Sequence, residues 1–145
     1  MTNALFTLER ITAEAIDSVR SYESAANTAN TPHLVGVLRD QAAKRNDLVA
    51  DLNAEIVRLG GEAQTSGSTA GTAQRLWQSV AEVFARGEET AAERVEEAED
   101  HLEEAFRKAL DAGVFEPHTR AVVARAHARI SEGEKLTDRL EDRYD

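Results

Sequence analysis

Hydrophobic residues recur every three or four positions along most of the chain, which is the spacing of one face of an α-helix. In the first stretch these positions are Leu8, Ile11, Ala15, Val19, Tyr22 and Ala26. Glycine or proline separates each stretch from the next. The pattern predicts an all-α protein, one domain spanning 1–145, with helices at about 4–28, 32–59, 69–86, 88–112 and 117–143.

The boundaries between these helices follow from local chemistry. Thr31 and Pro32 are suited to the N-cap and the first position of the second helix, because proline lacks only an N–H that would be unpaired there. Gly60 and Gly61 are suited to its end, since glycine accepts the positive φ of a C-terminal cap. Ser68 is the expected N-cap of the shorter helix that follows.

The lengths and connections of the helices predict their packing. Four helices of about 25 residues are each roughly 36 to 42 Å long, and matched lengths suit a four-helix bundle. Short turns join the first pair and the last pair, whereas a loop and the 69–86 helix connect the second long helix to the third. We expect this connection to be a crossover, which gives a ferritin-like four-helix bundle; an up-and-down bundle with an appended helix is the alternative.

Composition and charge narrow the classes of function. The chain has no cysteine, which excludes disulfides and thiolate-bound metals. Its net charge of -10 argues against nucleic acid as a partner, because binding to phosphates depends on clustered Lys and Arg. No run of 18 apolar residues indicates a membrane span, and no signal peptide is evident, so we expect a cytoplasmic protein.

Polar residues interrupt the apolar faces of two helices near mid-length. Glu99 lies on the stripe that contains Val95 and Leu102, and Gln41 and Arg45 interrupt the stripe of the second helix. A buried carboxylate is costly unless it is paired. We expect Arg45 and Glu99 to meet in a central polar layer, with Gln41 and Tyr22 completing its hydrogen bonds. If the helices are rotated, both charges instead lie at the solvated rim.

The same faces lack the ligands of a di-metal bundle. Such a site takes a Glu from each of two helices and a Glu-x-x-His pair from each of the other two. None of the four histidines has a Glu three positions before it. We therefore expect no metal cofactor. A divergent iron or other divalent-metal site remains the alternative, with these candidate ligands: Asp40, Glu96, Glu99, His127 and Glu134.

The short helix between the two pairs carries one strongly apolar face. Leu76, Trp77, Val80 and Phe84 share this face and are expected to dock the helix on the bundle.

Several motifs resemble an uncharacterised bacterial group of ferritin-like four-helix-bundle proteins, classed as a domain of unknown function. They are Ser21-Tyr22, the segment 54–61 ending in Leu-Gly-Gly, the segment 67–71 with Arg75 and Trp77, and Glu96, Glu99-Asp100 and Phe106. The resemblance covers nearly the whole chain and implies the crossover bundle. It also implies glutamates on the first two helices, at positions that hold Val19 and Asp40 here.

Three functional interpretations remain open at this point. The first is a non-catalytic bundle with a structural, stress-related or partner-binding role, which includes a homodimer formed through a helix face. The second is a divergent di-metal binding protein or oxidase of the ferritin-like class. The third is a bundle that holds a small apolar ligand beneath the helix of Trp77.

Overall fold

The computed structural model describes residues 2–86 and 91–144, with side chains for 3–86 and 91–132. Within these residues every regular element is a helix, which confirms the all-α class. The helices are α1 (Thr2–Thr28), α2 (Pro32–Arg58), α3 (Thr72–Ala85), α4 (Ala91–Asp111) and α5 (Pro117–Tyr144). The predicted start of the third long helix, at residue 88, lies outside the described residues.

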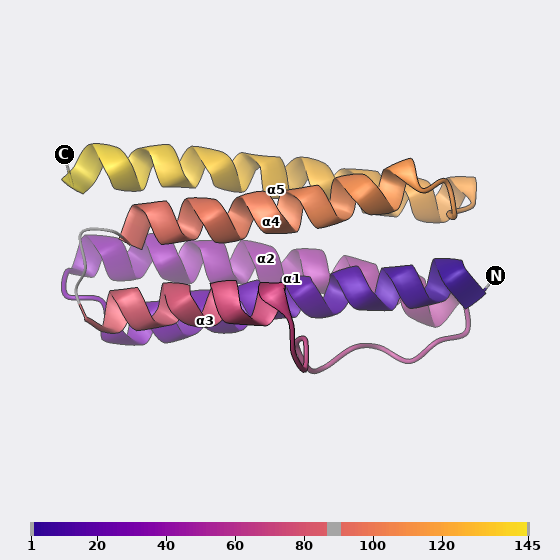
Figure 1. Cartoon of the computed structure of the whole chain (residues 1–145), viewed down its shortest axis with the longest axis horizontal. Helices are drawn as coiled ribbons and strands as arrows, with labels where there is room; N and C mark the ends of the chain where they lie inside the picture. The colour runs from indigo at the N-terminus through magenta and orange to yellow at the C-terminus, as the bar shows by residue number, and fades with distance from the viewer. Residues whose placement is uncertain (1, 87–90, 145) are drawn as a thin grey trace.

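The four long helices lie side by side along the long axis of the molecule (Figure 1). α1 and α2 form one antiparallel hairpin, and α4 and α5 form another. The segment between α2 and α3 returns along the molecule, so that α2 and α4 run in the same direction (Figure 1). Contacts join α1 to α2, α2 to α5, α5 to α4 and α4 to α1, and α3 packs against both α1 and α4.

The ends of α2 show the predicted capping. The Thr31 hydroxyl oxygen accepts a hydrogen bond from the Leu34 N–H at 3.2 Å, and Pro32 takes the first helical position. At the other end Gly60 has φ 93°, and the Gly61 N–H donates to the carbonyl of Ile56. A positive φ strains residues that have a Cβ, so glycine at position 60 lets the helix end here without backbone strain.

The predicted start of the short helix was wrong: α3 begins at Thr72 rather than near residue 69. Ser68 does not cap it, because the residue at the N-cap position is Gly71; the Ser68 N–H donates to Asp17 Oδ1 on α1 at 2.9 Å. A Cβ on Gly67 would lie 2.1 Å from the same carboxylate oxygen, so any other residue there would displace the Asp17 side chain. The chain turns into the helix at Gly71, whose φ is 109°. The Asp17 contact holds the 67–68 segment against α1 ahead of the helix.

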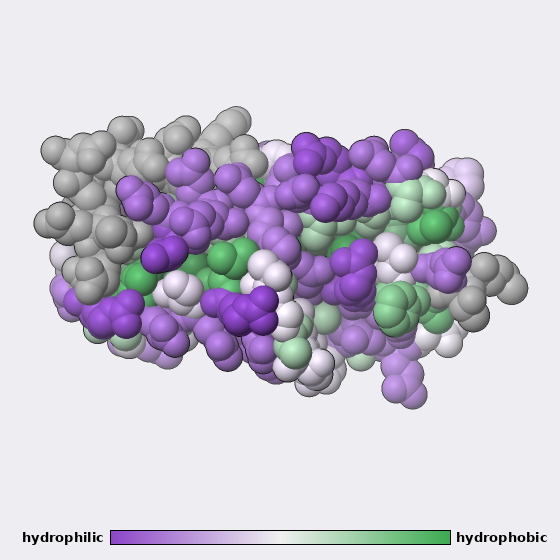
Figure 2. All heavy atoms as spheres, in the orientation of Figure 1, coloured by the Kyte–Doolittle hydropathy of each residue, from purple (hydrophilic) through white to green (hydrophobic). Residues whose placement is uncertain are grey.

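The core consists of the apolar faces predicted from the sequence. All six repeating positions of α1 are buried, as are Val95, Leu102 and Phe106 of α4. Polar and charged side chains cover most of the face seen in Figure 2, and hydrophobic residues show mainly in its furrows. No helix in the described part of the chain is long and apolar enough to cross a membrane.

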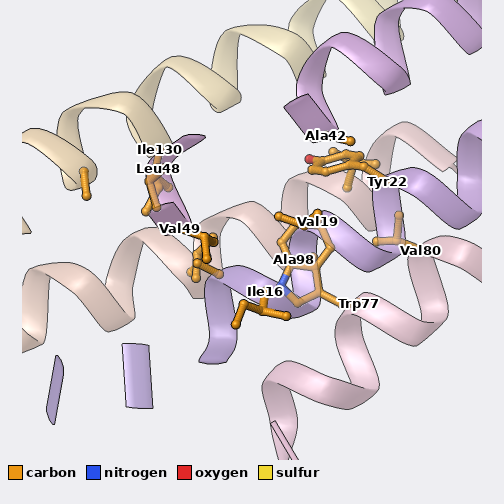
Figure 3. Close-up of a cluster of buried hydrophobic side chains, with 14 of the residues drawn as sticks. Ile16, Val19, Tyr22, Ala42, Leu48, Val49, Trp77, Val80, Ala98 and Ile130 are labelled. Carbon is orange, nitrogen blue, oxygen red and sulfur yellow. The ribbon is translucent and has the colours of Figure 1, made fainter. Parts of the chain in front are cut away.

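α3 docks through the expected face. Trp77, Val80 and Phe84 are buried, and Leu76 is half-buried against the core. The Trp77 ring lies beside Ile16 and Val19 of α1 (Figure 3). It meets the Tyr22 ring edge-on at a centroid distance of 5.4 Å, and the Ser21 hydroxyl donates to the Trp77 carbonyl at 2.6 Å. These contacts fix α3 on α1 directly beside the central polar layer.

Candidate functional site

A buried ion pair between α2 and α4 forms the middle of the molecule. Arg45 Nη2 lies 2.9 Å from both carboxylate oxygens of Glu99. The side chains are 2% and 0% exposed, so the pair lies in the core rather than at the rim. With so little water nearby, each charge depends on the other for its stability. The contact expected from the two interrupted apolar faces is present.

Two hydroxyl groups of α1 complete this cluster. The Tyr22 hydroxyl donates a hydrogen bond to Glu99 Oε2, and Arg45 Nη1 donates to the Ser18 hydroxyl oxygen at 3.0 Å. Burial, followed by the negative charge of Glu99, raises the pKa of Tyr22 well above its usual range, which keeps the phenol protonated as a donor. We call Ser18, Tyr22, Arg45 and Glu99 the central cluster; it joins α1, α2 and α4.

Gln41 does not take the predicted role in this layer. Its side chain is buried one turn before Arg45, but in the described chain its amide makes no hydrogen bond to any member of the central cluster. Ser18, which was not among the predicted residues, takes that place instead. A signal was available, because Ser18 precedes Tyr22 by four residues and so shares its helix face.

The alternative metal ligands are not brought together. Asp40 is exposed and pairs with Lys44 at 3.2 Å, Glu96 is exposed, and His127 Nε2 contacts Glu103 at 2.7 Å. The side chain of Glu134 lies outside the described residues. Across the described side chains, no group of three or more acidic or histidine residues could hold a metal ion.

The residues of the central layer also fit a di-metal centre poorly. Divalent iron needs several inward carboxylates to balance its charge. Here α1 presents the buried Val19, and α2 presents the guanidinium of Arg45, which holds both oxygens of Glu99. A cation placed on Glu99 would be repelled by Arg45 at close range.

A second inward carboxylate, Glu55, lies near the far end of α2 and was not predicted. It is 3% exposed and accepts hydrogen bonds from Arg58 at 2.8 and 2.9 Å and from the Thr119 hydroxyl at 2.5 Å, while His118 Nδ1 lies 3.1 Å away. The hydrogen bonds from Arg58, ahead of those from Thr119 and His118, lower the pKa of Glu55 to about 2. These contacts fasten the start of α5 to the end of α2.

A third buried carboxylate, Glu14, belongs to α1 and faces α4. It contacts Arg10 at 3.2 Å and His101 Nε2 at 3.3 Å. Burial raises its pKa, and the charges of His101 and Arg10 act in the opposite direction. The Glu14–His101 contact therefore joins α1 to α4.

The space beneath α3 is filled by side chains. Trp77 is 2% exposed and packs on Tyr22. These two rings occupy the space beneath α3 in which a small apolar ligand would have to bind. The cleft beside it has a volume of about 240 Å³ and is lined by Trp77 and Ala81 together with polar residues such as Asp17, Arg20 and Gln74. A cleft of this size is smaller than most ligand pockets.

Comparison with known proteins identifies the family but no activity. No curated protein and no solved structure matches the chain. The model of one family, described as a domain of unknown function (DUF2383), matches residues 3–112. The matched segment contains α1 to α4 and all four residues of the central cluster. The chain therefore belongs to the DUF2383 family.

Proposed function

We propose that this protein is a ferritin-like four-helix bundle that has no di-metal centre and serves a non-catalytic role, as a structural or partner-binding protein. The ferritin-like part is supported by the two antiparallel hairpins, with α2 and α4 running in the same direction (Figure 1). The 59–71 segment together with α3 then corresponds to the long crossover of such bundles.

The observation that carries this proposal is the bidentate contact of Arg45 with Glu99. In a di-metal bundle the central layer is rich in carboxylates that the metal ions neutralise. Here one buried guanidinium neutralises one buried carboxylate, so the middle of the bundle needs no cation for charge balance.

The same hydrogen bonds argue against acid–base catalysis at the central cluster. A general base needs a free lone pair within reach of a substrate proton. Both oxygens of Glu99 accept hydrogen bonds from Arg45, one also accepts from Tyr22, and Glu99 is fully buried. The cluster is arranged to hold three helices together rather than to exchange protons.

Metal analysis of the full chain, expressed in iron-supplemented cells, tests the proposal. We expect well below one iron per chain by elemental analysis, and no saturable heat when Fe(II) is titrated anaerobically into the purified protein. About two irons per chain, the content of a di-iron site, would contradict it. Fewer than two irons per chain that also remain in Glu99→Gln would be held away from the central cluster and would not amount to a di-iron site.

A further inference from the structure

A polar cleft between α2 and α5 opens over the central cluster. It has a volume of about 250 Å³, which is small for a ligand pocket and suits a molecule of few heavy atoms. Among the described side chains, the polar and charged residues lining it are Gln41, Lys44, Arg45, Asp47, Arg129 and Glu132. The proposed structural role uses only Arg45 of these.

The floor of the cleft carries hydrogen-bond donors that lack partners. Gln41 is 8% exposed, and in the described chain its amide has no hydrogen bond. Arg45 has five N–H donors, and its three hydrogen bonds, one to Ser18 and two to Glu99, do not involve Nε. Both side chains line the cleft, so these donors are open to an acceptor on a bound molecule.

Some charged side chains at the rim of the cleft already form ion pairs within the protein, and others do not. Lys44 pairs with Asp40 at 3.2 Å, and Arg129 pairs with Asp51 at 2.7 Å; neither of these aspartates lines the cleft. Asp47 and Glu132 have no ion-pair partner in the described part of the chain. The rim therefore offers two carboxylates to a cation, above a floor that offers donors to an acceptor.

We propose that this cleft binds a small zwitterion of the amino-acid class, with its carboxylate on the donors of Gln41 and Arg45 and its ammonium group facing Asp47 and Glu132. Overall neutrality favours such a ligand, because Arg45 is already balanced by Glu99 and a simple anion would add an unbalanced charge near that carboxylate. The site is additional to the structural role of the central cluster and does not depend on it.

NMR titration of the ¹⁵N-labelled full chain tests the proposal. The probes are glycine and β-alanine, with acetate and ethylamine as molecules that carry only one of the two charges. We expect saturable shifts of the Gln41 side-chain amide and Arg45 Nε–H signals with at least one of the zwitterions. Affinity for each one-charge probe should be at least ~10-fold lower, since a lost charge-assisted contact removes about 1.5 kcal/mol.

Variants separate the floor from the rim. Gln41→Met, which keeps the volume but removes the amide, should abolish the response, whereas Gln78→Met, at an exposed glutamine of α3, should not. Asp47→Asn/Glu132→Gln changes only exposed side chains, so the fold is retained, and it should lower zwitterion affinity to that of acetate. No saturable shift with either zwitterion, an equal response to acetate, or a response that survives Gln41→Met would overturn the proposal.

Discussion

Two buried glutamates of this bundle, Glu99 and Glu55, hold helices together under different conditions. Glu99 is 0% exposed and its partner Arg45 is 2% exposed. Glu55 is 2% exposed at the side chain, but its partner Arg58 is 45% exposed. Removing one member of a fully buried pair leaves the other charge in the core with neither a partner nor water. If Glu55 is removed, by contrast, the Arg58 guanidinium can be solvated. The loss of stability when an ion pair is broken therefore depends more on the burial of the basic partner than on the burial of the carboxylate.

The two sites also differ in what they connect. The central cluster joins α1, α2 and α4 at mid-length, while Glu55 fastens α2 to the start of α5. The Glu55 site also makes stability depend on pH, because its hydrogen bonds lower the pKa of Glu55 to about 2.

The largest expected effect is that of Glu99→Leu. It leaves the Arg45 guanidinium buried without a counter-charge, and we expect a loss of ~3–5 kcal/mol in the free energy of unfolding. Urea denaturation followed by circular dichroism measures this. Glu96→Leu, at an exposed position of the same helix, is the matched control and should change stability by less than about 0.5 kcal/mol. Equal losses in the two variants would mean that Glu99 is solvated.

Tyr22→Phe should have an intermediate effect. It removes the phenol that donates to Glu99 but keeps the ring beside Trp77 and leaves the Arg45 contact in place. A hydrogen bond to a charged group contributes ~1.5–3 kcal/mol, so we expect a loss of about 2 kcal/mol in the same denaturation assay. A variant as stable as the parent protein would show that this hydrogen bond adds nothing to the pair.

Glu55→Gln should give the smallest loss at neutral pH and a change in pH dependence. The pKa of Glu55 is lowered from 4.5 to about 2 in the folded protein, so its stabilisation is complete above the unfolded pKa and is lost as pH falls from about 5 to 2. Allowing for solvent screening at Arg58, we expect a loss of ~1–2 kcal/mol at pH 7. Thermal unfolding at several pH values should show a flatter acid limb than in the parent protein.

Exposed Glu62→Gln is the control for this series, and it should retain the acid limb of the parent. If Glu55→Gln unfolds in acid with the parent's slope, the hydrogen bonds at Glu55 do not control the acid response.

The sequence predicted those features that depend on local pattern. Capping by Thr31 and Pro32 set the start of α2, and Gly60 marked its end, because these effects act within one helical turn. Glu99 and Arg45 were also predictable, since a charge on an otherwise apolar helix face has to be paired in the core.

Features that depend on packing between distant segments were missed. Glu55 lies beside the predicted face of α2, and Thr119 of α5 packs on it from 64 positions away. Ser68 has the chemistry of an N-cap, yet Asp17 takes its N–H from 51 positions away. Gln41 shares the face of Arg45, but Ser18 occupies the position expected for it. Helical periodicity predicts on which face of its helix a residue lies, but it does not predict which residue of a neighbouring helix packs against it.

A double-mutant cycle of Arg45→Met and Glu99→Leu tests most directly whether the central pair is self-sufficient. Each single variant leaves one buried charge and should lose ~3–5 kcal/mol in the free energy of unfolding, whereas the double variant leaves none and should lie within about 1–2 kcal/mol of the parent. Recovery of stability in the double variant is the predicted result. Additive losses from the two substitutions would contradict the account, because they would mean that Arg45 and Glu99 do not depend on each other.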